Sequence, residues 1–164
     1  MPFGHGSLCY IGCMLLDSRL VPQTIVRPNS FVGLMALYES NYLRLLHLVP
    51  DLERLDGCFR SRVAGECELF VDVLDRARYT ITLALTYHFE SAEGRLADPD
   101  MQVRAYLDGR LAEVLSMGGK HRHAELRRLR RANHRSLDAR WKRNVVLNKW
   151  LEYLTDQGHL ILER

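Results

Sequence analysis

The sequence has no run of eighteen apolar residues and only four cysteines, Cys9, Cys13, Cys58 and Cys67. A helix that crosses a bilayer needs such a run, so we expect no membrane-spanning helix. The cysteines are too few and too irregularly spaced for the disulfide framework of a small secreted domain. The apolar stretch 8–16 is not preceded by Lys or Arg, as a signal peptide would be. We therefore expect a cytoplasmic protein without membrane association.

The common catalytic motifs are also missing from the chain. It contains no glycine-rich phosphate loop, no Gly-x-Ser-x-Gly, no His-Glu-x-x-His and no dinucleotide glycine pattern. His121, His123 and His134 lie among many cations and lack the ligand spacings expected for zinc. We predict no metal ion and no cofactor. The absences favour a protein that is not an enzyme, and a reaction of an unfamiliar type stays open.

The chain is long enough for one hydrophobic core. Its 164 residues are 47% hydrophobic and 26% charged, as in ordinary globular domains. Residues 1–28, closed by Pro22 and Pro28, show no sustained periodicity, and Met14 could itself be an initiator. We predict a loose N-terminal extension over 1–28, with a start that could be misplaced, and a single domain over 29–164.

Two helices are expected, one near each end of that domain. Asn29 and Ser30 are suited to cap the first, and Pro50 ends it. Its apolar residues recur at alternating spacings of four and three: Phe31, Met35, Tyr38, Tyr42, Leu45 and Val49. The second helix begins after Ser136 and ends at Gly158.

Between these helices the apolar period changes to two, which is typical of strands. The predicted strands are 67–73, 79–89, 101–107 and 110–115, with 58–65 as a fifth. Asp108 and Gly109 form a favoured two-residue hairpin turn, and 90–100 reads as a polar loop. The predicted fold is α+β: a four- to five-stranded antiparallel meander, flanked by an N-terminal and a C-terminal helix that pack on one face of the sheet.

The alternation also places carboxylates beside a histidine. Glu66, Glu68 and Asp72 fall on one side of their strand, and His88 of the next strand shares that side. Such a set could perform acid–base chemistry. Polar pairs on a solvated sheet face give the same pattern, and we favour that interpretation.

The net charge of +3 conceals a polarised chain. Residues 110–149 hold twelve basic residues against three acids, a local +9, and residues 51–100 hold eleven acids against six arginines, a local −5. The sequence does not indicate whether residues 118–135 form a helix or a loop. A basic segment suits an anionic partner, with nucleic acid as one alternative and a solvated face that pairs within the domain as the other. The candidate patch for an anionic partner is Arg127, Arg128, Arg130, Arg131, Lys142 and Arg143.

The second hairpin resembles the hallmark of a known family. Asp98-Pro99-Asp100-Met101-Gln102-Val103-Arg104-Ala105-Tyr106-Leu107-Asp108-Gly109-Arg110-Leu111-Ala112-Glu113-Val114 is similar to the YqiB-like family of uncharacterised proteobacterial proteins, a domain of unknown function. Further similarities lie at Arg78-Tyr79-Thr80, at Glu39-x-Asn41-Tyr42, and at Asp138, Asn144, Leu147, Trp150-Leu151, Tyr153 and Gly158. The resemblance spans about 31–162 and implies an α+β fold and a bacterial cytoplasm, but no reaction.

Periodicity places Arg104 and Tyr106 on the strand side opposite Met101 and Val103. An Arg and a Tyr on an exposed sheet face suit an anionic group or a partner. The alternative is a structural pair of Arg104 with Glu113 or with Asp108 across the hairpin. The candidate ligand or partner residues are Arg78, Arg104, Tyr106, Asp108, Glu113 and Asn144.

These patterns predict a binding or adaptor module that uses an exposed sheet face and a basic C-terminal segment. Its partner would be a protein or an anionic ligand. One alternative is a nucleic-acid-binding protein that uses the arginine-rich segment 120–143. The other is an enzyme or a sensor of a nucleotide or another anionic small molecule. The sequence does not indicate the oligomeric state.

Overall fold

The computed structural model describes residues 29–91, 94–118 and 136–162, so the predicted extension 1–28 lies outside the described residues. Residues 119–135, whose state was not predicted, lie outside them as well. The elements in chain order are α2 (Phe31–Leu48), β1 (Cys58–Ser61), β2 (Leu69–Arg76), β3 (Thr80–Ser91), β4 (Gly94–Tyr106), β5 (Leu111–Gly118) and α4 (Leu137–Asp156). No described helix has the length and apolar character needed to cross a membrane.

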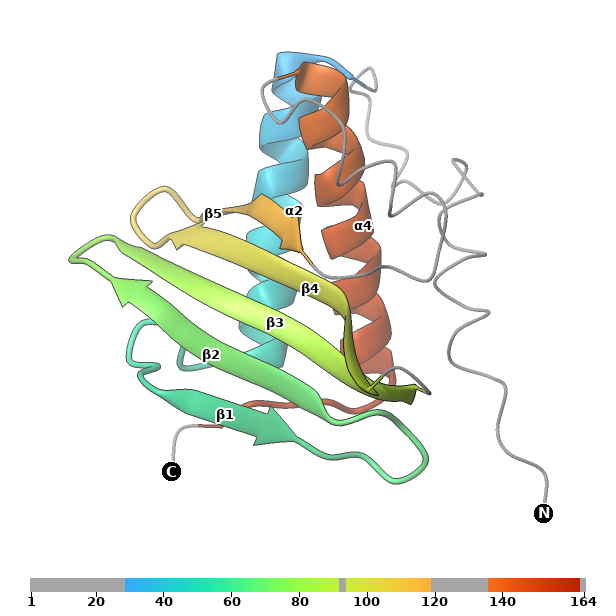
Figure 1. The fold of residues 1–164 in the computed structure, drawn as a ribbon. Coiled ribbons are helices and arrows are strands. Elements are labelled where there is room, and N and C mark those ends of the chain that lie inside the picture. Colours follow the sequence, from blue (N-terminus) through green and yellow to red (C-terminus); the bar gives the residue numbers. More distant parts are fainter. Residues whose placement is uncertain (1–28, 92–93, 119–135, 163–164) are drawn as a thin grey trace.

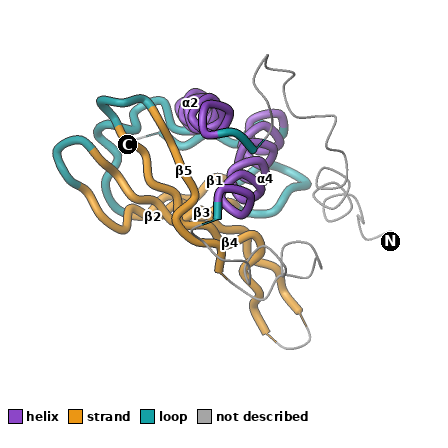
Figure 2. Tube along the Cα trace, turned by 90° about the horizontal axis from the view of Figure 1, so that it is seen from above, coloured by secondary structure: helices purple, strands orange, loops and turns teal. Residues whose placement is uncertain are grey.

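The strands form one five-stranded antiparallel sheet in the order β1-β2-β3-β4-β5. Helices α2 and α4 lie side by side and cover the same face of the sheet (Figures 1 and 2). The predicted α+β fold, with five strands between two helices, is therefore confirmed.

The core lies between the sheet and the two helices. On β3, Ile81, Leu83, Leu85 and Tyr87 are at most 1% exposed, because every second residue of the strand faces the helices. The residues of α2 and α4 that meet them include Leu45, Leu48, Leu147, Trp150, Leu151 and Leu154. A smaller cluster of Leu34, Leu37, Tyr38 and Trp141 joins the N-terminal parts of the two helices.

Buried asparagines join both helices to the edge strand β5. Asn144 of α4 accepts a hydrogen bond from the Val114 N–H at 3.1 Å, and its Oδ1 also accepts from Asn41 of α2 at 3.1 Å. Asn41 Nδ2 lies 3.5 Å from the Ala112 carbonyl, and Asn148 Nδ2 donates to Asn41 Oδ1 at 3.0 Å. Asn41 and Asn144 are fully buried. Buried polar groups need such partners, so these amides satisfy edge groups of β5 that another strand would otherwise pair.

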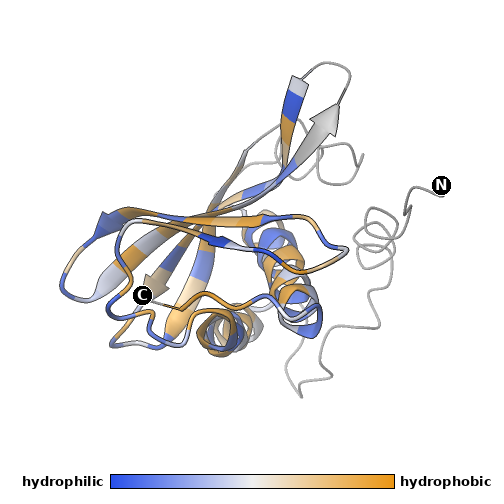
Figure 3. Ribbon diagram, turned by 90° about the horizontal axis from the view of Figure 1, so that it is seen from below, coloured by the Kyte–Doolittle hydropathy of each residue, from blue (hydrophilic) through white to orange (hydrophobic). Residues whose placement is uncertain are grey.

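Two local predictions in the hairpins are wrong. The expected polar loop 90–100 is mostly strand, because β3 continues to Ser91 and β4 begins at Gly94. The ends of β3 and β4 form an arm that projects beyond the layers, away from the helices (Figures 2 and 3), where neither strand side needs to be apolar. The second hairpin exists, but its loop spans 107–110 rather than two residues, and Arg110 takes a positive φ of 53°.

The chain end ties the helical layer to the far edge of the sheet. Gly158, at φ 87°, ends α4 in the left-handed conformation that glycine tolerates best, as predicted. The following Ile161 N–H donates to the Leu48 carbonyl at the end of α2. The neighbouring Leu160 N–H donates to Ser61 Oγ on β1 at 3.3 Å.

Replacing Asn144 with leucine tests the asparagine network. Asn144→Leu leaves the Val114 N–H without its acceptor in a buried site and removes the shortest of the hydrogen bonds that Asn41 Nδ2 donates, which we expect to lower the free energy of unfolding by about 2–4 kcal/mol. Urea denaturation measures the change. The control Lys142→Gln removes only the exposed pair with Asp138 and is expected to cost under about 0.5 kcal/mol. Equal effects of the two substitutions would contradict a structural role of the network.

Candidate functional site

The face of the sheet opposite the helices is not covered by any described element (Figures 1 and 2). We call it the open face. The strand registers place these residues on it: Arg60, Phe70, Asp72, Thr82, Ala84, Thr86, His88, Asp100, Gln102, Arg104, Tyr106 and Glu113. The prediction that Arg104 and Tyr106 lie opposite Met101 and Val103 is confirmed, since Met101 and Val103 are completely buried in the core.

Two tyrosines share one carboxylate at the β5 end of the open face. The Tyr106 hydroxyl donates to Glu113 Oε1 at 2.8 Å, and the Tyr38 hydroxyl of α2 donates to Glu113 Oε2 at 3.0 Å. Glu113 therefore connects the helical layer to β4 around the edge of β5. Burial, and then the Glu113 carboxylate, raises the pKa of both tyrosines, so both remain neutral hydrogen-bond donors at neutral pH.

Arg104 is the cation of this group. Its Nε donates to Thr82 Oγ1 on β3 at 3.2 Å, and it faces Glu113 in the strand register. Among the described residues, no ion pair joins Arg104 to Glu113 or to Asp108, and the alternative of a structural pair across the hairpin is met only in the strand register, where Arg104 and Glu113 are partners. The Glu113 oxygens are occupied by tyrosine hydroxyls instead. The Arg104 guanidinium also lies close enough to the Tyr106 hydroxyl to oppose the rise in the pKa of Tyr106, and since a guanidinium has several N–H donors, some remain for another acceptor.

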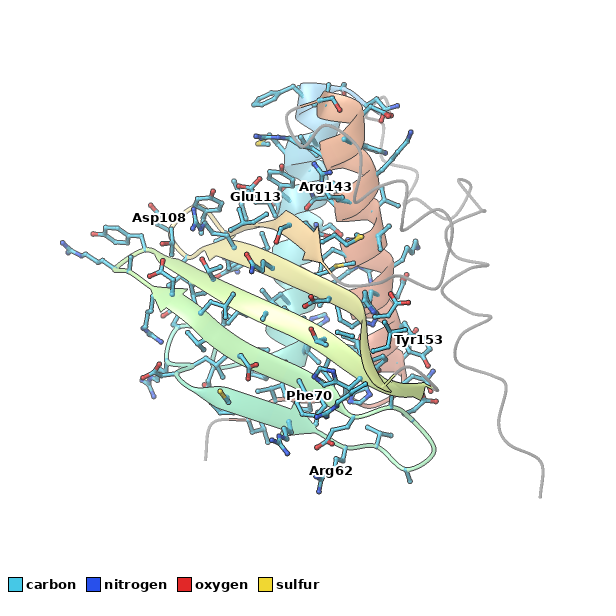
Figure 4. The ribbon with its side chains drawn as sticks, in the orientation of Figure 1. Arg62, Phe70, Asp108, Glu113, Arg143 and Tyr153 are labelled. Atoms are coloured by element: carbon cyan, nitrogen blue, oxygen red, sulfur yellow. The ribbon has the colours of Figure 1, made fainter. Side chains whose placement is uncertain are left out.

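Arg78 and Asp108 lie in two adjoining turns at the same end of the sheet. The Leu107 N–H donates to the Tyr79 carbonyl at 2.8 Å, which joins the β4–β5 turn to the β2–β3 turn. Arg78 is exposed and stacks on Tyr79, with its guanidinium carbon 4.9 Å from the ring centroid. Asp108 accepts a hydrogen bond from the Gly109 N–H, so its carboxylate also organises the turn. Figure 4 shows Asp108 and Glu113 at this end.

The other predicted site residues lie away from the open face. Asn144 is buried in the network between the helices and β5. Lys142 pairs with Asp138 at 2.8 Å on the surface of α4, and Arg143 is only 1% exposed. Burial lowers the pKa of Arg143. The predicted patch residues Arg127, Arg128, Arg130 and Arg131 lie outside the described residues.

The sequence reasoning missed a cationic aromatic cluster at the opposite end of the open face. Phe70 of β2 lies under two arginines, Arg60 of β1 and Arg95 of β4, whose guanidinium carbons are each 5.1 Å from its ring centroid. The His88 ring meets Phe70 edge to face at 4.6 Å. Phe70 interrupts the polar side of an otherwise alternating strand, and that single aromatic residue is the signal that could have indicated the cluster.

The predicted carboxylate set divides between the two faces. Glu68 pairs with Arg62 at 2.7 Å, and Asp72 lies on the open face. Glu66, however, precedes β2 and accepts a hydrogen bond at 2.7 Å from Tyr153 of α4, so its placement beside the other two is wrong. The alternation did not apply to Glu66 because the strand begins only at Leu69.

A buried polar chain lies near Glu66. The Tyr87 hydroxyl is 2.9 Å from His159 Nε2, and His159 Nδ1 is 3.0 Å from Ser61 Oγ. His159 is 2% exposed, and its contacts join the chain end to β1 and β3. Burial lowers the pKa of His159 below its ordinary value of 6.5, and Glu66 opposes this shift more weakly.

Metal binding and a surface pocket are two other ways in which the described residues could hold a ligand. The described residues contain no group of three or more His, Cys, Asp or Glu that could hold a metal ion. A surface pocket of about 530 Å³ lies between the end of α2 and the β4–β5 turn. Its lining includes acids and bases in equal number, Asp51 and Glu53 with Arg54 and Arg110. This balance does not indicate the charge of a ligand.

The fold and the open face define a class: a small α+β protein whose antiparallel meander has helices on one face and a polar, aromatic surface on the other. Residues 44–160 match the family model described as "Protein of unknown function (DUF1249)". The chain belongs to this family, because the match covers more than half of its length. No curated protein and no solved structure matches the chain.

The buried histidine makes the stability of the protein sensitive to acid. Because the pKa of His159 is lower in the folded chain than in the unfolded chain, the unfolded chain binds more protons below pH 6.5. We expect the free energy of unfolding to fall as the pH drops from 7 to 5. His159→Gln, which does not titrate, is expected to reduce this slope in urea denaturation. His47→Gln, at an exposed position of α2, should keep the wild-type slope; an unchanged slope in His159→Gln would contradict the prediction.

Proposed function

We propose that this protein is a binding module that takes an anionic partner on the open face of its sheet. One observation carries the proposal: Arg60, Arg95 and Arg104 lie on this face without an ion pair to any described residue. Arginines held in place by rings and hydroxyls are well suited to receive carboxylate or phosphate oxygens.

The rigidity of the Arg104 group supports the same role. Thr82 fixes Nε of Arg104, so the guanidinium is already oriented before a partner arrives, whereas the single proton of the Tyr106 hydroxyl is donated to Glu113. Preorganised side chains lose less conformational freedom on binding, which favours affinity. The side chain that would make the charged contact is Arg104, and the ring of Tyr106, held by Glu113, would lie beside it.

The family member, the cellular location and the domain organisation are proposed from the sequence. The hairpin residues Pro99, Met101, Val103, Arg104, Tyr106 and Asp108 support a YqiB-like member from a proteobacterium. The few, irregularly spaced cysteines support a cytoplasmic location. The absence of the common catalytic motifs supports a protein that is not an enzyme. We propose that residues 1–28 are an N-terminal extension and that residues 29–164 form one domain. The arginines at 127, 128, 130 and 131 are a second contact region for the same partner.

Site-specific photo-crosslinking in cells of the source organism tests the proposal. A benzophenone amino acid at Gln102, an exposed position in the middle of the open face, is expected to form an adduct with the partner. Arg104→Gln should reduce the adduct about tenfold, because a charge-assisted hydrogen bond contributes about 1.5–3 kcal/mol. Nuclease and protease treatment of the adduct identifies the partner's chemical class.

The matched control carries the same crosslinker at Glu39, an exposed position of α2 on the helical layer. We expect no adduct there. Equal adducts at Gln102 and Glu39, or no adduct at Gln102, would show that the open face is not the binding surface. A variant with neutral residues at 127, 128, 130 and 131 measures the contribution of the basic segment separately.

A further inference from the structure

A second candidate site on the open face is the cationic aromatic cluster of Arg60, Phe70, His88 and Arg95. It brings together β1, β2, β3 and the start of β4, at the end of the sheet opposite Asp108 and Glu113 (Figure 4). Here the β3–β4 arm bends away from the helices (Figures 2 and 3), and the register of β3 with β4 shifts between Thr86 and His88.

The guanidinium groups in this cluster are positioned by an aromatic ring rather than by acids. Both Arg60 and Arg95 are exposed, and each approaches Phe70 to 5.1 Å. Their guanidinium carbons are therefore no more than about twice that distance apart. Since neither arginine forms an ion pair with a described residue, their N–H groups are available to an external acceptor.

Acids also surround the cluster: Glu90 is the register partner of Arg95, and Asp100, Asp72 and Glu68 lie close enough to His88 to oppose the lowering of its pKa. Glu68 pairs with Arg62, and Asp100 accepts a hydrogen bond from Thr86 Oγ1 at 2.9 Å. Asp72 lies beside Ala84 in the register, two pairs along the strand from Phe70 and on the same face. These carboxylates limit the net charge of the face, so a ligand must gain affinity from stacking as well as from charge.

From this geometry we infer that the cluster binds single-stranded nucleic acid. The inference rests on the proposed function, because it names the partner class for the same open face. Flat guanidinium groups and aromatic rings offer stacking surfaces for unpaired bases, and arginine N–H groups bind the phosphates between them. Gln102, which is exposed, lies on the same face between Phe70 and Arg104 and supplies hydrogen-bonding groups along a path for the strand, and His88 lies on the side of Phe70 away from Arg104.

Duplex nucleic acid fits this site less well. Its bases are stacked inside the helix and cannot reach Arg60 or Arg95, so only the phosphate contacts remain. An acidic protein segment would use the same arginines, but it has no planar base to occupy the stacking surfaces. The geometry therefore favours an unpaired strand over both, and each alternative becomes an outcome of the test.

Fluorescence anisotropy with the full chain and labelled 12-mers of deoxythymidine and of uridine tests the inference. We expect binding at low salt and weaker binding of a 12-bp duplex. Because two phosphate contacts contribute about −1.4 to the slope of log affinity against log salt, the double variant Arg60→Gln/Arg95→Gln should bind at least about tenfold more weakly, with a slope about 1.4 less steep than that of the wild type. Phe70→Leu should weaken binding but keep the slope, because the ring positions the arginines without carrying charge.

Arg62→Gln is the matched control, because Arg62 is an exposed arginine near the cluster that already pairs with Glu68. It should bind like the wild type. No binding of either 12-mer at low salt, equal binding of the duplex, or an equal loss in Arg62→Gln would overturn the inference. A protein adduct at Gln102 without oligonucleotide binding would leave the proposed function standing and refute this partner class.

Discussion

The asparagine network between the helices and β5 is the interaction on which the rest of the structure depends. An edge strand exposes unpaired backbone groups that attract other strands. In this protein Asn144 accepts from Val114, and Asn41 reaches the Ala112 carbonyl, so side chains of two helices take the place of a further strand. Because the same residues also hold α2 against α4, one hydrogen-bond network both protects the sheet edge and packs the two helices together.

This arrangement assigns different roles to the two faces of the sheet. Both helices are held at one face and at the β5 edge, where they bury the apolar residues of all the central strands. The opposite face keeps a polar and aromatic surface with arginines that are positioned by Thr82 and Phe70 rather than by carboxylates. A face whose polar groups were needed for stability would be expected to pair its charges internally. The unpaired arginines instead agree with a surface that receives a partner.

The two ends of the open face differ in the way they hold their donors. At the β5 end, Glu113 binds two tyrosine hydroxyls and leaves Arg104 without an ion pair. At the other end, Phe70 holds two arginines through its ring, and His88 completes the cluster. The first arrangement suits recognition of one oxyanion, and the second suits a ligand with both planar groups and negative charge. Together they span β1 to β5 and would engage an extended ligand.

The sequence by itself determined the helices, the strand order and the face of each residue in the regular strands. Alternation placed Met101 and Val103 inside and Arg104 and Tyr106 outside, because a strand that is half buried must alternate. It did not determine the course of the chain where burial gives no periodic signal. Residues of the β3–β4 arm were predicted to form a loop, because the arm projects beyond the core and its sequence has no apolar alternation. Glu66 was assigned to the wrong side of the sheet because it precedes the first residue of β2. Only the tertiary structure decided that Asn144 is internal and that Arg60, Phe70 and Arg95 meet, because these contacts join residues far apart in the chain.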